Sequence, residues 1–414
     1  MDHAVSRLLA HERIRAARQH IERTDEVTLA RQATLSAIPA PTGAEGRRAA
    51  RVAELFREIG LGDVTVDHAG NAHGWFGKNG EPAAPVVLAA HLDTVFGADE
   101  DVAVERRGHR LEGPGISDNA RGLAALVGVA DAMVAARVPT ARPILFAATV
   151  GEEGSGDLRG VKYLLNGGNA GDGGTGHPTP VAFIALDGAG LERVIHRALG
   201  SKRYHVTFRG PGGHSWAAFG VANPANAVGR AAALLADLPP PTANGAPAPS
   251  RPRTTCAVVR LGGGTGLNSI PQEAWLDLDL RSEDPQALAQ LDVTVHAALE
   301  RAADDENRRR SGGTPPLRLE IQLVGDRPSG VTPRTHPLVQ AAVAVNRALG
   351  RDAELTSAST DANVPIALGI PAIALGAGGK AGDAHLATEW YENIEGALGV
   401  VRALLVTAAM AELR

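Results

Sequence analysis

Short apolar runs that end in polar side chains are the main hydrophobic pattern in the first half of the chain. Residues 86–90 are continuously apolar and are followed by His91 and, two positions later, Asp93. A run without alternation predicts a strand that is buried on both faces. Residues i and i+2 of a strand share a face, so His91 and Asp93 are expected to point the same way where the strand ends. A carboxylate placed there can orient a metal-binding imidazole, and a buried histidine beside a capping aspartate is the alternative.

Strand and helix patterns alternate over residues 1–199. Strands are expected at 64–66, 72–76, 86–91, 102–105, 109–112, 143–150 and 181–186, and helices at 4–22, 26–37, 44–59, 120–136 and 158–165. This alternation predicts an α/β fold, with a mostly parallel sheet and helices on both faces. The Gly-rich stretch 166–180 predicts a surface loop.

The pattern changes near residue 200. Alternating strands are expected at 204–208, 254–261, 274–280 and 317–324, with helices at 224–238 and 285–303. This order matches the split βαβ unit of a small α+β, ferredoxin-like domain. Within it, 239–252 predicts a Pro-rich loop and the charged stretch 304–313 predicts an unstructured segment. The α/β pattern then resumes, with a helix at 337–349, a strand at 372–375 and a closing helix at 394–413. We therefore expect one α/β domain, residues 1–199 and 327–414, interrupted by a second domain at 200–326.

Composition narrows the chemistry. Hydrophobic residues make up 44% of the chain and charged residues 21%, which is typical of a globular protein. A net charge of -5 gives no basic surface for nucleic acid and no polybasic membrane anchor, and no apolar run approaches membrane-spanning length. The charged stretch 1–20 does not resemble a secretory signal, so a cytoplasmic location is expected. Cys256 is the single cysteine, which leaves histidines and carboxylates to bind any metal and suits zinc, manganese or cobalt.

Metal-capable side chains follow several elements of the predicted α/β domain. They are His91 and Asp93, Asp118, Glu152 and Glu153, Asp187, and His385. Ligands bind beyond the carboxyl ends of the strands in open α/β sheets, so these side chains are expected to gather at one edge of the sheet. Two histidines and three carboxylates can hold two divalent ions, with one carboxylate and a water between them. For the adjacent glutamates, a solvated acidic pair is the alternative.

The same chain resembles the aminoacylase/carboxypeptidase superfamily of co-catalytic zinc peptidases, and within it the peptidase T-like branch. The resemblance extends from about Leu29 to the C-terminus. It rests on six segments in this order: His91-Leu92-Asp93-Thr94-Val95, Gly115-Ile116-Ser117-Asp118-Asn119, Gly151-Glu152-Glu153-Gly154, Ala185-Leu186-Asp187-Gly188, Gly210-Pro211-Gly212-Gly213-His214-Ser215 and Ala384-His385. It implies a catalytic domain of the zinc-peptidase type whose inserted domain serves as a lid and for dimerisation.

The resemblance also implies two divalent metal ions, with zinc as the first choice, and the residues that would bind them. His91 and Asp187 would bind one ion. Glu153 and His385 would bind the other. Asp118 would bridge the two ions, in a segment where relatives often have a cis peptide bond after this residue.

Further roles are implied for residues around the metals. Asp93 would orient His91, and Glu152 would be the general base that moves a proton from the bridging water to the leaving amine. His214 would stabilise the oxyanion, in its own or in a partner subunit. Asn268 and Arg281 match positions that bind the backbone or carboxylate of the substrate.

A glycine run offers one more candidate, since the backbone N–H groups of residues 376–379, Gly378 among them, could bind an anionic substrate terminus. The resulting hypothesis is a dinuclear metallohydrolase that cleaves an amide bond of a small peptide, as an aminopeptidase, carboxypeptidase or dipeptidase. An N-acyl- or N-carbamoyl-amino-acid amidohydrolase with the same metal site is one alternative, and a metal- or peptide-binding protein without catalysis is another. A homodimer formed through the inserted domain is expected.

Overall fold

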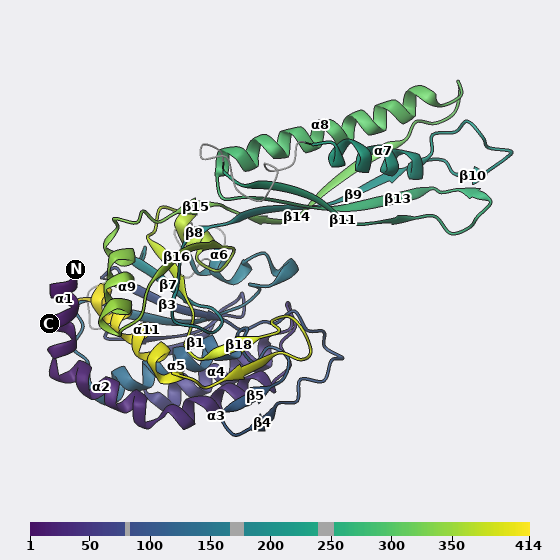
Figure 1. Ribbon diagram of the computed structural model, residues 1–414. Helices are drawn as coiled ribbons and strands as arrows, with labels where there is room; N and C mark the ends of the chain where they lie inside the picture. The colour runs from purple at the N-terminus through teal and green to yellow at the C-terminus, as the bar shows by residue number, and fades with distance from the viewer. Residues whose placement is uncertain (79–82, 166–177, 239–251) are drawn as a thin grey trace. The chain divides into compact units, whose positions relative to one another are not determined.

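The computed structural model describes residues 1–78, 83–165, 178–238 and 252–414 (Figure 1). These residues form two compact units. Unit 1 comprises Met1–Ala198 and Val331–Arg414, and unit 2 comprises Leu199–Gly330. The predicted loops at 166–180 and 239–252 lie almost entirely outside the described residues. No helix within the described ranges combines the length and hydrophobicity of a membrane-spanning segment.

Unit 1 combines a large sheet with flanking helices. Its described helices are α1 (Asp2–Ala10), α2 (Glu12–Arg23), α3 (Asp25–Ser36), α4 (Gly46–Ile59), α5 (Ala120–Ala136), α6 (Arg159–Leu165), α9 (Pro337–Ala348), α10 (Asn363–Ala367) and α11 (Gly396–Ala411). Its described strands are β1 (Gly62–Val66), β2 (Ala72–Phe76), β3 (Val86–His91), β4 (Glu105–Arg107), β5 (Arg110–Glu112), β6 (Ile144–Thr149), β7 (Ala182–Leu186), β8 (Arg193–Ala198), β16 (Glu354–Ala358), β17 (Ala372–Leu375), β18 (Lys380–Gly382) and β19 (Trp390–Glu392).

The strand order of the large sheet is β1-β2-β6-β3-β7-β17-β8, followed by the short strand β15 (Gly330–Val331), and β16 also pairs with β8. The central strand β3 runs parallel to β6 and β7, and β17 runs parallel to β7. Alternate residues of β3 enter two different cores: Val86 and Leu88 pack with residues of α5 and α11, whereas Val87 and Ala89 pack with residues of α6 and α10. The prediction of a mostly parallel sheet with helices on both faces is therefore confirmed.

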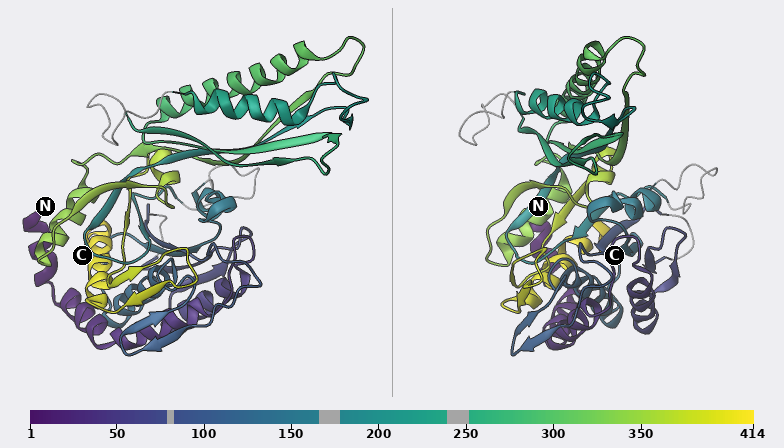
Figure 2. Two further views of the ribbon diagram at one scale, coloured as in Figure 1. Left: turned by 45° about the vertical axis from the view of Figure 1, so that its right-hand side comes forward. Right: turned by 90° about the vertical axis from the view of Figure 1, so that its right-hand side faces the viewer.

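Unit 2 is a four-stranded antiparallel sheet covered by two helices. Its elements are β9 (Gly200–Arg209), β10 (Gly213–His214), α7 (Pro224–Ala236), β11 (Thr254–Gly263), β12 (Ser269–Ile270), β13 (Glu273–Ser282), α8 (Pro285–Arg309) and β14 (Arg318–Arg327), and β15 (Gly330–Val331) lies at the boundary. The sheet order is β11-β13-β9-β14. Both helices lie on one face of this sheet, where they form a common core with β9 and β13 (Figure 2).

Three local predictions need correction. Residues 304–309 are helical rather than unstructured, because the buried Glu306 carboxylate accepts hydrogen bonds from the backbone N–H of Asn223 and from Arg230, which ties the charged end of α8 to α7. Residues 4–22 form two helices, since the chain is extended at His11, whose ring caps α2 by accepting from the N–H of Arg13. Strands β8 and β16 and helix α10 were not expected, because each has only five or six residues, too few to show a clear period.

Candidate metal centre

Five side chains that sequence analysis assigned to metal binding meet around the carboxylate of Asp118. The Nε2 atom of His91 lies 3.0 Å from one Asp118 oxygen, and the Nε2 atom of His385 lies 3.2 Å from the other. Asp187 is 3.9 Å from His91 Nε2, and Glu153 is 3.3 Å from His385 Nε2. The centre thus contains two histidine–carboxylate groups that share Asp118.

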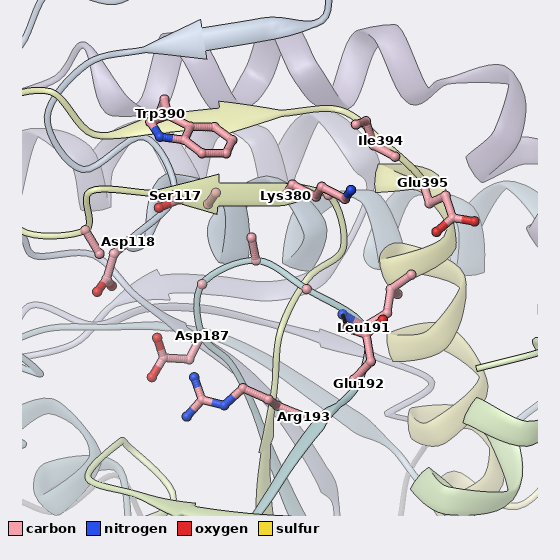
Figure 3. Close-up of a pocket in the computed structure, with 17 residues that line it drawn as sticks. Ser117, Asp118, Asp187, Leu191, Glu192, Arg193, Lys380, Trp390, Ile394 and Glu395 are labelled. Carbon is pink, nitrogen blue, oxygen red and sulfur yellow. Dashed lines mark hydrogen bonds between the residues drawn. The ribbon is translucent and has the colours of Figure 1, made fainter. Parts of the chain in front are cut away.

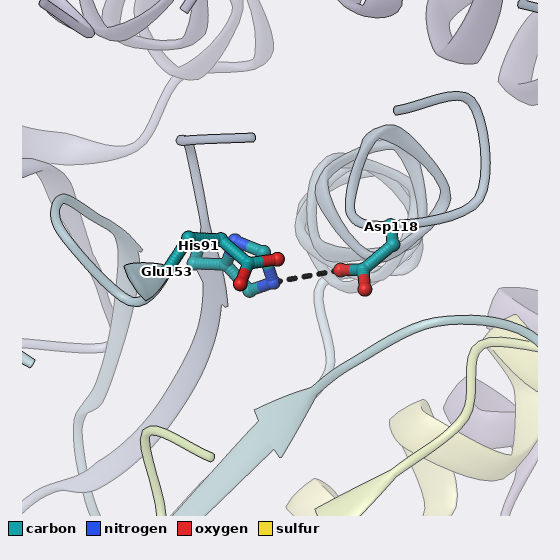
Figure 4. Close-up of side chains that lie close together, drawn as sticks. All are labelled: His91, Asp118 and Glu153. Carbon is teal, nitrogen blue, oxygen red and sulfur yellow. Dashed lines mark hydrogen bonds and ion pairs between the residues drawn. The ribbon is translucent and has the colours of Figure 1, made fainter. Parts of the chain in front are cut away.

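The sheet brings these residues together. His91 is the last residue of β3 and lies opposite Thr149, the last residue of the parallel strand β6, so that Glu153 emerges close to His91 (Figure 4). Asp187 directly follows β7, the other parallel neighbour of β3. The carboxyl ends of three parallel strands therefore supply one side of the centre.

Two loops supply the other side: one carries Asp118, and the other carries His385 and follows β18. Asp118 precedes α5, and the next residue, Asn119, accepts a hydrogen bond from the N–H of Gly122 as the cap of this helix. The Asn119 amide also donates to the carbonyl of Leu186 and accepts from the N–H of Gly188, which ties the Asp118 loop to the end of β7. The Asp118-Asn119 peptide bond is cis, as the sequence resemblance implied.

Asp93 contacts both His91 and the two glutamates. The Nδ1 atom of His91 lies 3.1 Å from the backbone carbonyl of Asp93 and 3.6 Å from its carboxylate. A carbonyl can only accept, so Nδ1 carries the proton and Nε2 is left to bind a metal. The buried carboxylate of Asp93 accepts from the N–H groups of Glu152 and Glu153, each at 2.9 Å, and from Thr42. Asp93 thus contacts His91 Nδ1 with both its main-chain carbonyl and its carboxylate, and the carboxylate also fixes the two glutamates.

Crowding of the carboxylates shifts their pKa values. Burial, together with the charge of Asp118, raises the pKa of Glu153 to about 7 and that of Asp187 to about 6. Burial also favours the neutral form of Asp118, but hydrogen bonds from His385 and His91 outweigh this effect and hold its pKa well below the usual range. The hydrogen bond to Asp118 raises the pKa of His385 to about 9. A divalent cation would compensate this excess of negative charge, and a set of imidazoles and carboxylates suits zinc and similar ions.

Metal binding at the centre is expected to release protons and to weaken as the pH falls. Without metal, His385 is protonated at neutral pH and Glu153 is partly protonated, because their pKa values are raised to about 9 and about 7. A ligand must lose its proton to bind a metal, so affinity should rise with pH through both values and fall below them. Calorimetric titration of zinc into the chelated protein, in buffers of different ionisation enthalpy, counts the released protons. An affinity independent of pH over this range would contradict the ligand assignment.

Glu389 was missed by the sequence analysis, although it supports the centre directly. Its carboxylate is fully buried and accepts hydrogen bonds from the N–H and hydroxyl of Ser117, at 2.7 and 2.6 Å, and from the N–H of Asp118, at 2.9 Å. The N–H of Gly115 donates to the same carboxylate. Glu389 thus anchors the main chain on both sides of Ser117 and fixes the position of Asp118. It lies in a polar stretch beside β19, where no period or spacing distinguishes it from a solvated residue.

Replacing Glu389 with Gln is expected to weaken metal binding. The amide group would turn an NH2 toward backbone donors, so at least one buried N–H would lose its acceptor. Loss of a residue that orients a ligand costs about 10- to 100-fold in metal affinity. Zinc titration against a competing chelator measures the change, and Glu392→Gln on β19 serves as the matched control. Equal affinities of the two variants would show that Glu389 does not position Asp118.

The predicted oxyanion-stabilising residue His214 and the predicted substrate-binding residue Asn268 lie on paired segments of unit 2. His214 in β10 pairs with Ser269 in β12, and the N–H of Ser215 donates to the carbonyl of Asn268. The His214 ring is exposed and accepts a hydrogen bond from the N–H of Trp216. These contacts order the turn that carries both residues, and their role toward a substrate stays a prediction.

Arg281 and Gly378 have local partners. The guanidinium of Arg281, on β13, forms an ion pair with Asp279 at 2.9 Å, and its role toward a substrate also stays a prediction. The N–H of Gly378 donates to the carbonyl of Gly190 at 3.0 Å, so the expectation that this N–H is free for an anionic substrate is wrong. Gly378 is also tightly packed, because it has φ +81 and a Cβ there would lie 2.7 Å from the carbonyl of Gly396.

Comparison with known proteins places the chain among hydrolases. The model of peptidase family M20/M25/M40 matches residues 87–411. Aminopeptidase PepT from Bacillus cereus is 19% identical, with a TM-score of 0.70 over 93% of this chain and 98% of that one. YxeP from Bacillus subtilis, described as a dinuclear metal binding peptidase, is 15% identical, with a TM-score of 0.64 over 94% and 98%. A hydantoinase/carbamoylase family amidase from Burkholderia ambifaria is 17% identical, with a TM-score of 0.60 over 96% and 98%. At these identities the structural likeness concerns the fold.

Proposed function

The chain belongs to peptidase family M20/M25/M40, and from this premise we propose that it is a dinuclear metallohydrolase that cleaves an amide bond of a small peptide. One observation carries the proposal: two histidine–carboxylate groups share the carboxylate of Asp118 at the carboxyl edge of a parallel sheet. A bridging carboxylate between two imidazole-containing groups is what a pair of divalent ions requires.

His91 and Asp187 would hold one ion, and His385 and Glu153 the other, with Asp118 between them. We propose zinc as the native metal, with cobalt and manganese as the alternatives, because the ligands are nitrogen and oxygen atoms. When bound, a pair of such ions lowers the pKa of a water molecule and polarises the carbonyl group of the substrate.

Glu152 is the proposed general base. Glu152 is 5% exposed, and its backbone N–H donates to Asp93. Burial lowers the pKa of His91, but hydrogen bonds to Asp118 and Asp93 and, to a smaller extent, the charge of Glu152 raise it. A carboxylate in this position can take a proton from the attacking water and pass it to the leaving amine. Glu152 and Glu153 are consecutive, and the Asp93 carboxylate holds the backbone N–H of each. Their side chains can therefore point in different directions, so that one acts as a metal ligand and the other as a base.

Unit 2 supplies the proposed substrate contacts. His214 would stabilise the oxyanion, and Asn268 and Arg281 would bind the backbone or carboxylate of the substrate. We also propose that two chains form a dimer through unit 2, whose strand β11 lies at an edge of its sheet. Light scattering coupled to size-exclusion chromatography tests this part, and a monomer would require His214 to act within its own chain.

A turnover assay by mass spectrometry tests the proposed function. Zinc-reconstituted protein would be incubated with a mixture of di- and tripeptides, N-acyl amino acids and N-carbamoyl amino acids, with chelated protein as the blank. Peptide products that need metal would support the peptidase, and products from acyl or carbamoyl substrates alone would identify an amidohydrolase. The amidase from Burkholderia ambifaria, which shares this fold, makes that second outcome worth including. No product from protein that holds two metals per chain would favour a binding protein.

A further inference from the structure

A cavity of about 540 Å³ opens beside the metal centre within unit 1 (Figure 3). The ligands Asp118 and Asp187 form part of its wall. Residues 188–190, which are all glycine or alanine, form another part, so the space is not filled by large side chains. The cavity is therefore a place where a substrate residue next to the scissile bond can lie.

Two cationic side chains line this cavity. Arg193 is the first residue of β8, and its guanidinium points toward the same side of the cavity as Asp187 (Figure 3). Lys380 is the first residue of β18 and contributes to another wall. Both side chains are exposed. Burial and the charge of Asp118 raise the pKa of Asp187, and the charge of Arg193 partly opposes this shift, so Arg193 lies close enough to Asp187 to interact with it.

The two glutamates of the wall already have partners. Glu395 forms an ion pair with Arg351. The carboxylate of Glu192 accepts a hydrogen bond from the N–H of Leu191 at 3.2 Å and interacts with the buried guanidinium of Arg402. The available charge in the cavity beyond the metal ligands is therefore positive.

We propose that this cavity binds a carboxylate of the substrate, with Arg193 as its main partner and Lys380 as a second positive charge. The inference rests on the proposed function and extends it by naming peptides that carry a negative charge near the scissile bond as the preferred substrates. An arginine is suited to this task because its planar guanidinium binds both oxygens of a carboxylate at once. The carboxylate can be the C-terminus of a short peptide or the side chain of Asp or Glu.

The test compares Arg193→Gln with wild-type holoenzyme on matched peptides. Ala-Glu, Ala-Gln and their C-terminal amides differ only in where a carboxylate is present, and Glu-Ala and Gln-Ala place the acidic side chain on the other residue. Wild type should prefer the carboxylate-bearing member of a pair, and the variant should reduce that preference by about 10- to 100-fold, mainly through KM. Loss on amidation identifies a terminal carboxylate, and loss from Glu to Gln identifies a side chain. Arg57→Gln, an exposed change on α4, is the control.

A binding measurement provides a second readout. Calorimetric titration of the same peptides into metal-loaded Glu152→Gln protein, with and without Arg193→Gln, reports affinity without turnover. An unchanged preference in Arg193→Gln, or a wild type that treats charged and neutral peptides alike, overturns the inference while the hydrolase proposal stands. Failure to cleave any peptide, in protein shown to hold its metals, instead contradicts the proposed function.

Discussion

Replacing Glu152 with Gln is expected to lower kcat by about 10²- to 10⁴-fold while the metal content stays unchanged. Glutamine has the same size, and the backbone N–H that Asp93 holds is not altered, so the turn that carries Glu153 should keep its position. The amide cannot take a proton from water at neutral pH, and the step that delivers a proton to the leaving amine is lost with it. Elemental analysis and steady-state kinetics on the same sample measure both quantities.

The neighbouring substitution is the matched control. Glu153→Gln removes a side chain that lies 3.3 Å from His385, so it is expected to lose metal as well as turnover. Both variants remove one negative charge, at adjacent positions. A change at the base should lower turnover and leave the metal content unchanged, whereas a change at a ligand should lower both. A Glu152→Gln protein with wild-type kcat would contradict the assignment of Glu152.

Much of the metal centre could be predicted because its residues follow buried strands. A continuous apolar run fixes a strand inside the sheet, and the next polar residue must then lie at its end, as His91 and Asp187 do. The parallel pairing of β3 with β6 and β7 brings these ends to one edge. The family resemblance supplied the order of the segments, and the match over residues 87–411 confirms the family.

The supporting contacts could not be predicted, since they depend on residues far apart in the sequence. Glu389 accepts from Ser117 and Asp118 across more than 270 positions. The carboxylate of Asp93 also accepts hydrogen bonds from the N–H groups of Glu152 and Glu153, a contact that no local pattern indicates. The N–H of Gly378 is already bonded to Gly190, a pairing that follows from the adjacent ends of β7 and β17. Tertiary hydrogen bonds of this kind leave no period in the sequence.

In the fold, too, the elements with a clear local pattern could be predicted and those that depend on tertiary contacts could not. Long apolar or clearly periodic segments such as α5 and β17 were predicted at or close to their observed bounds. Strand β8 was missed because its burial does not alternate: three consecutive buried residues, 194–196, lie between the exposed Arg193 and Arg197. The end of α8 was missed because a charged stretch was taken as solvated, whereas one face of it is buried through Ala302, Ala303 and Glu306.

Asp118→Asn is expected to abolish binding of both metals, which makes it the most damaging single change at the centre. Asp118 is within hydrogen-bond distance of His91 through one oxygen and of His385 through the other, so both halves of the centre depend on it. Loss of a residue that only orients a ligand costs about 10- to 100-fold in metal affinity, and loss of the shared ligand should cost more at each site. Asp187→Asn, which removes a ligand from one half only, is the matched comparison.

In the metal-free protein, the pKa values of the neighbouring carboxyl groups provide an independent measurement of the effect of Asp118. The charge of Asp118 contributes to the raised pKa values of Glu153 and Asp187, so Asp118→Asn should lower both toward the ordinary range. Metal stoichiometry by elemental analysis should then fall from two per chain to none in Asp118→Asn and to one in Asp187→Asn, with turnover lost in both. Retention of one metal by Asp118→Asn would mean that Asp118 belongs to a single site, and the two histidine–carboxylate groups would have to bind their ions independently.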